Sequence, residues 1–144
     1  MADDSKLIAL DLGERRIGLA VSGPGGMALP AGHIVRSKLA EDVQQVIEAA
    51  SERKAQGIVV GIPYELDGES GTAVNLARGF IRALRRAIGE ETALVIYEMD
   101  ERFTSVEAEG LLRESGVQPS RDRGTVDETA AMLILQRFLA QNPS

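Results

Sequence analysis

Two short segments without a polar side chain restrict the fold of this chain more than any other feature. They are residues 7–10 and 58–62, each followed by turn-forming residues. Runs of this length are typical of strands that are covered on both faces, as in a parallel sheet. The sequence therefore predicts an α/β protein in which these two strands are central and buried between layers of helices.

The other elements follow from apolar periodicity and from the positions of glycine and proline. Residues 6–11, 17–22 and about 28–36 are expected to form an antiparallel meander, because Gly-rich turns separate them. Further strands are predicted over residues 58–62 and 94–99, and helices over about 39–50, 72–89, 104–116 and 125–140.

The resulting order, β-β-β-α-β-α-β-α-α, predicts a mixed five-stranded sheet, with three antiparallel strands followed by βαβ crossovers and helices on both faces. We expect the first, fourth and fifth strands to be the buried central ones. No repeat, low-complexity segment or linker interrupts the chain. Residues 1–144 are therefore expected to form one domain, with an ordered core over about 6–140.

Composition excludes several classes of protein. The chain has no cysteine, which excludes disulfides, thiolate catalysis and cysteine-bound zinc. No apolar stretch approaches ~18 residues, and residues 1–6 lack the apolar core of a signal peptide, so we expect a cytoplasmic protein that does not contact membranes. A net charge of −6 argues against simple attraction to nucleic acid, unless part of the negative charge binds cations.

Acidic residues recur where predicted strands end and helices begin. Asp11 closes the first apolar run, and Asp100 and Glu101 follow the fifth strand. Asp127 enters the last helix. Ligands usually bind at the carboxyl ends of parallel strands, so carboxylates gathered there suggest a hard cation held by oxygen ligands. The pattern points to Mg²⁺ or Mn²⁺ and to metal-assisted phosphoryl chemistry.

Each carboxylate also has an ordinary alternative. Asp127 would stabilise a helix N-terminus by ~0.3–1 kcal/mol, and Asp100 would cap a turn. Asp11 is the hardest to explain in this way, because an aspartate at a strand end before a tight turn has no obvious packing role. By residue type alone, the metal site and these structural roles both stay open.

Two features downstream suggest a surface for nucleic acid. In the loop from Tyr64, Gly68 and Gly71 would allow the backbone to approach a phosphate at the start of the next helix. That helix carries a stripe of arginines opposite an apolar face of Leu76, Phe80, Leu84 and Ile88; the stripe is Arg78, Arg82, Arg85 and Arg86. It is either a solvated helix face or a track that contacts phosphates.

Four segments together resemble the motifs of the YqgF/RuvX family, in the order the family has them. They are residues 11–20, 59–71, 100–105 and 127–136. The opening Asp11 and Gly13 also resemble the first phosphate loop of the actin and Hsp70 superfamily, but 144 residues leave no room for the second lobe which that fold needs. The YqgF/RuvX resemblance implies a ribonuclease H-like fold of the resolvase type.

It also implies a nuclease that uses Mg²⁺ or Mn²⁺ and processes pre-16S rRNA, or that resolves Holliday junctions in DNA. A resolvase is expected to be a symmetric homodimer, because it cuts two strands across a two-fold junction. The partner would be structured RNA or branched DNA. A hypothesis of another class is a binding module for nucleic acid or ribosome assembly that keeps the fold without catalysis.

Transferred to this sequence, the resemblance assigns catalysis and metal binding to Asp11, Asp100, Glu101 and Asp127. Neighbours on a strand point to opposite faces, so only one of Asp100 and Glu101 is expected to bind the metal, and the sequence leaves open which. Phosphate contacts are expected from arginines in or near the motifs: Arg15, Arg16, Arg102, Arg121 and Arg123.

Overall fold

The computed structural model describes residues 6–63, 71–89, 94–100, 110–111, 113–114 and 123–141. Its strands are β1 (Leu7–Leu12), β2 (Arg16–Ser22), β3 (Ala28–Val35), β4 (Gly57–Ile62) and β5 (Val95–Asp100). Its helices are α1 (Leu39–Glu52), α2 (Thr72–Ile88) and α4 (Arg123–Gln141), with a single 3₁₀ turn, η1 (Pro24–Gly26), between β2 and β3. The predicted order is confirmed for these elements. None of the helices in these ranges is long and apolar enough to cross a membrane.

The five strands form one mixed sheet in the order β3-β2-β1-β4-β5. β1 pairs antiparallel with β2, β2 pairs antiparallel with β3, and β4 runs parallel to both β1 and β5. The prediction that the first and fourth strands are central is confirmed. The prediction that the fifth strand is central was wrong, because β4 lies next to β1 and β5 is added on the outer side of β4. β5 is therefore an edge strand, and most of its residues are partly or fully exposed.

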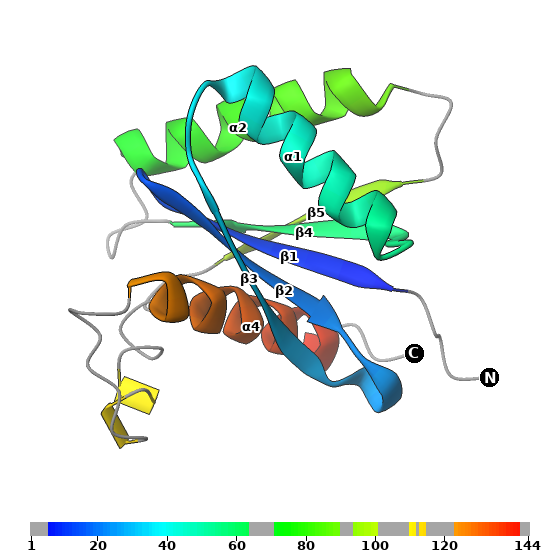
Figure 1. Cartoon of the computed structure of the whole chain (residues 1–144), viewed down its shortest axis with the longest axis vertical. Coiled ribbons are helices and arrows are strands. Elements are labelled where there is room, and N and C mark those ends of the chain that lie inside the picture. The colour runs from blue at the N-terminus through cyan, green and yellow to red at the C-terminus, as the bar shows by residue number, and fades with distance from the viewer. Residues whose placement is uncertain are drawn as a thin grey trace.

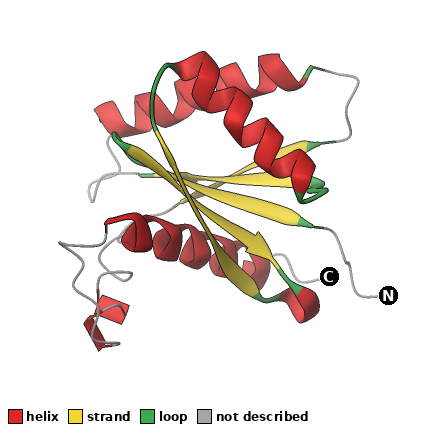
Figure 2. Ribbon diagram, viewed as in Figure 1, coloured by secondary structure: helices red, strands yellow, loops and turns green. Residues whose placement is uncertain are grey.

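Helices cover both faces of the sheet, so the fold has three layers (Figure 1). α1 and α2 lie on one face and α4 on the other, and the same layering is seen with helices in red and strands in yellow (Figure 2). Ile8 and Leu10 of β1 pack in the core under α1 and α2, whereas Leu7 and Ala9 pack under α4. By this alternation Asp11 belongs to the face that α4 covers.

Two details of the helices differ from the prediction. The last helix was predicted to begin at Thr125, but α4 begins at Arg123. Leu76 was expected in the core, but it is 54% exposed, because α2 turns a face of Val74, Ala77, Phe80, Ile81 and Leu84 inward. Most of the helix predicted over 104–116 lies outside the described residues, and residues 110, 111, 113 and 114 are helical.

The backbone of α4 lies directly on Gly18 of β2. A Cβ atom built at Gly18 would fall well inside contact distance of the carbonyl oxygen of Asp127. Gly18 is also the residue of β2 that pairs with Asp11 of β1. The missing side chain therefore allows the N-terminal part of α4 to approach the end of β1.

Replacement of Gly18 by alanine is expected to push α4 away from the sheet and to lower the free energy of unfolding by roughly 1–3 kcal/mol, as overpacked sites do. Urea unfolding measures the change. Gly79 of α2 is the matched control, because a Cβ there would meet only the end of the Arg82 side chain at 3.9 Å. Gly79→Ala should stabilise the helix by up to ~1 kcal/mol, so equal effects of the two substitutions would contradict the packing argument.

Candidate active site

Asp11 and Asp127 are brought together by the contact at Gly18. Asp11 is 7% exposed and occupies the penultimate position of β1, on the α4 side. Its pairing partner Gly18 supports the backbone of Asp127. The backbone of Asp127 therefore lies beside the carboxyl end of β1, although Asp11 and Asp127 are 116 positions apart in the sequence.

Arg16 forms an ion pair with Asp127. The distance from Nε of Arg16 to Oδ2 of Asp127 is 2.7 Å, and the side chains are 28% and 18% exposed. Asp127 is the fifth residue of α4, beyond the first turn, so a purely dipole-stabilising role explains it poorly. Arg16, predicted to contact phosphate, holds a carboxylate in this structure.

The neighbouring residue of α4 contacts a different strand. Oε2 of Glu128 accepts a hydrogen bond of 2.6 Å from the backbone N–H of Gly32 in β3. Sequence reasoning did not single out Glu128 or Gly32, because nothing local links residues 96 positions apart. Two consecutive residues of α4 are thus attached to β2 and β3.

Asp100 is the last residue of β5 and lies on a different face of the sheet from Asp11. Met99 packs in the core under α4, and the ring of Tyr97 packs at a tilt of 53° against Phe138 of α4, with ring centroids 4.9 Å apart. Ile96 packs on the opposite side of the sheet, toward α1 and α2. Strand alternation therefore puts Asp100 on the side of Ile96, away from Asp11.

Asp100 also borders a surface hollow that Arg137 and Gln141 line. Since α-helices rise 1.5 Å per residue, Arg137 lies about 15 Å along α4 from Asp127. Glu101, the next residue after β5, lies outside the described residues. Within the described ranges, no three side chains of the metal-binding types form a group.

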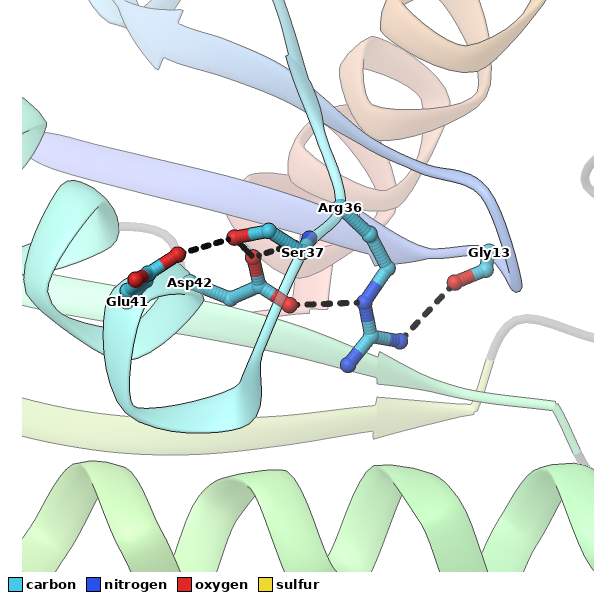
Figure 3. Close-up of polar contacts among 5 residues, drawn as sticks. All are labelled: Gly13, Arg36, Ser37, Glu41 and Asp42. Atoms are coloured by element: carbon cyan, nitrogen blue, oxygen red, sulfur yellow. Dashed lines mark hydrogen bonds and ion pairs between the residues drawn. The ribbon is translucent and has the colours of Figure 1, made fainter.

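The turn after Asp11 is held by Arg36, which forms a partly buried ion pair with Asp42. Nε of Arg36 lies 3.2 Å from Oδ2 of Asp42, and its Nη1 donates to the carbonyl oxygen of Gly13 at 2.9 Å (Figure 3). The backbone N–H of Arg36 donates to the carbonyl oxygen of Arg15. Arg36 therefore attaches the turn between β1 and β2 to the segment that leads into α1.

Asp42 is fully buried and connects this turn to α1. Its Oδ1 accepts the backbone N–H of Ser37 at 2.9 Å, just before the helix begins. The Arg36 guanidinium also lies over the ring of Phe80 of α2, 5.7 Å from its centroid. The turn that leads from Asp11 to Arg16 is consequently fixed against both helices of that face.

The remaining predicted contact residues are dispersed. Arg15 is exposed in the turn after β1, and Gly71 directly precedes α2. The four arginines of the stripe are exposed, as predicted, but α2 covers the face of the sheet opposite Asp11. One of them forms an ion pair, in which Nη2 of Arg85 lies 3.7 Å from Oε2 of Glu98. Gly68, Arg102 and Arg121 lie outside the described residues, as does the side chain of Arg123.

The residues at the end of β1 fit a hard divalent cation. The donors are carboxylate oxygens, which Mg²⁺ and Mn²⁺ prefer, and Asp11 is buried at the end of a strand. The ion pair of Asp127 with Arg16 shows that this carboxylate already interacts with a positive group.

Comparisons with known proteins identify the family of this chain. The sequence model of a family described as "RuvX: Holliday junction resolvase" matches residues 5–141. A proposed pre-16S rRNA nuclease of Synechococcus elongatus is 39% identical over 133 residues, which cover 92% of this chain and 87% of that protein. One of Rhodococcus erythropolis is 40% identical over 137 residues, covering 92% and 76%.

Solved structures share the fold. RuvC of T. thermophilus in complex with a Holliday junction substrate superposes with a TM-score of 0.61 at 15% identity, covering 97% of this chain and 98% of that one. The yeast mitochondrial Holliday junction resolvase gives a TM-score of 0.55 at 12% identity, covering 98% and 81%. The predicted α/β fold of the resolvase type is thereby confirmed.

Replacement of Asp42 by alanine is expected to lower the free energy of unfolding by about 3 kcal/mol, because it leaves the partly buried Arg36 without its anion. Asp42→Asn keeps an acceptor for the Ser37 N–H and should cost less. The exposed Glu41, one residue earlier, is the control. Glu41→Ala should change stability by less than ~1 kcal/mol, and an equal loss for both alanine variants would contradict the role of the buried pair.

Proposed function

Because this chain belongs to the RuvX family of Holliday junction resolvases, we propose that it is a metal-dependent nuclease that hydrolyses phosphodiester bonds of structured RNA, with the precursor of 16S rRNA as its substrate. The observation that carries the site is the meeting of Asp11 and Asp127 at Gly18. A protein with this task works in the cytoplasm, where we expect this one.

We assign the cation to Asp11, Asp127 and Glu101. Glu101 is preferred to Asp100, because alternation along β5 puts Asp100 on the face of Ile96, away from Asp11. When bound, Mg²⁺ or Mn²⁺ would supply Lewis-acid activation of water and stabilise charge at the scissile phosphate.

The protein's own residues orient the reacting groups. Hydrolysis joins the oxygen of water to phosphorus and releases the 3′ oxygen, so an acid set must be held still beside the phosphate. Arg16 holds the Asp127 carboxylate, and Arg36 fixes the turn that follows Asp11. The exposed Arg15 in that turn is the described arginine best placed to contact a neighbouring phosphate, and Arg102 of the third motif is assigned the same task.

A second candidate function is the resolution of four-way DNA junctions, which the name of the family favours. Carboxylates do not distinguish ribose from deoxyribose, so the acids are compatible with both substrates. A resolvase would act as a homodimer, because junction cleavage is symmetric. The proposed rRNA substrate rests on the names of the relatives in Synechococcus and Rhodococcus.

Asp11→Asn should lower kcat at least about 100-fold, since loss of even an outer partner of a metal ligand costs about 10–100-fold. The rate of cleavage of labelled RNA in Mg²⁺ or Mn²⁺ measures the change in kcat. A urea unfolding curve should show that the variant is still folded. Glu48→Gln, on the exposed side of α1, is the charge-matched control and should cleave like the parent protein. Parental rates in Asp11→Asn would exclude the metal site.

The choice of substrate is tested by cleavage of a pre-16S leader, single-stranded RNA, single-stranded DNA and a mobile four-way junction in parallel. We expect cuts in the leader RNA. Paired symmetric cuts found only in the junction would replace the RNA assignment with the resolvase. Binding that persists in a chelator, with no cleavage of any substrate in Mn²⁺, would identify a non-catalytic binding module.

A further inference from the structure

A β-bulge interrupts the pairing of β2 with β3 beside the candidate active site. Gly18 pairs with His33, but the next pair is Ala20 with Pro30, so β3 contains one residue more than β2 at this place. Gly32 lies in the bulge with φ of +83°, a conformation that glycine adopts without strain. Bulges next to active sites commonly redirect groups of the strand.

The bulge provides an attachment point for α4. The N–H of Gly32 donates to Oε2 of Glu128 at 2.6 Å, and hydrogen bonds to a carboxylate are stronger than those between neutral groups. Glu128 is partly buried, so this bond is shielded from water. The edge strand β3 thus makes a hydrogen bond to a carboxylate of the helix, in addition to the packing of Ala28 in the core under α4.

Two consecutive residues of α4, Asp127 and Glu128, make three contacts with the sheet. The backbone of Asp127 rests on Gly18, its carboxylate pairs with Arg16, and Glu128 is bound to the bulge that begins directly after Gly18. Successive residues of an α-helix point about 100° apart. When Glu128 is fixed on β3, the rotation of the helix about its axis is set, and Asp127 is directed toward β1 and β2.

We propose that Glu128 is a positioning residue: by accepting the Gly32 N–H it fixes the rotation of α4 and directs the Asp127 carboxylate toward Asp11. The proposal rests on the nuclease function inferred above. The Oε2 of Glu128 is engaged by Gly32 of β3, whereas Asp127 is engaged by Arg16 of β2. The effect of Glu128 on the reaction passes through Asp127.

The test compares the parent protein with Glu128→Ala, Glu128→Gln and a packing control, Leu139→Ala, which removes a partly buried side chain from the same helix. Three quantities are measured: Mn²⁺ affinity by calorimetry, kcat and KM for RNA cleavage, and the NMR signals of the Gly32 amide and the Arg16 Nε–H. Glu128→Ala should weaken Mn²⁺ binding and lower kcat, each by about 10-fold or more, with KM little changed.

Glu128→Gln keeps an acceptor oxygen and should recover most of kcat. Leu139→Ala should lose stability without these changes. The proposal is overturned if Glu128→Ala releases the Gly32 amide to exchange while Mn²⁺ affinity, kcat and the Arg16 signal match those of Leu139→Ala. A parent protein that neither cleaves nor binds Mn²⁺ contradicts the nuclease function instead; the shift of the Arg16 signal in Glu128→Ala alone then decides whether Glu128 positions Asp127.

Discussion

The contact between the backbone of α4 and Gly18 of β2 determines where the acidic residues lie. A helix normally packs on a sheet through the side chains of both elements. At Gly18 no side chain intervenes, and the carbonyl group of Asp127 reaches the strand itself. The same residue of β2 pairs with Asp11. The close approach therefore serves both the packing of the α4 layer and the assembly of the acids at the end of β1.

Ion pairs and hydrogen bonds on the two faces of the sheet stabilise this geometry separately. On the α4 face, Arg16 and the bulge at Gly32 hold consecutive residues of the helix. On the other face, the pair of Arg36 with the buried Asp42 holds the turn after β1. In these contacts an acidic side chain accepts from a donor on another segment of the chain. Although the net charge of the protein is −6, every buried side-chain nitrogen or oxygen atom of the described residues has a hydrogen-bond partner.

Much of the fold could be predicted because its signals are local. The apolar runs at 7–10 and 58–62 identified the central strands, and alternation along β1 assigns Asp11 a face. The position of β5 could not be predicted, since the direction of a crossover is not encoded in the strand that follows it. The bond of Glu128 to Gly32 spans 96 positions and depends on a bulge, which has no sequence signal beyond one glycine. The exposure of Leu76 was also not predictable, because it depends on which face of α2 packs against the sheet.

The span of the Arg16–Asp127 pair has a consequence for protein synthesis. Its partners are 111 positions apart, and the elements leave the ribosome in the order β1 to α4. Before α4 has left the ribosome, a nascent chain lacks Asp127 and cannot bring it to the end of β1. The candidate site is therefore completed only after α4 has been translated, so a partly made chain has no complete set of these acids.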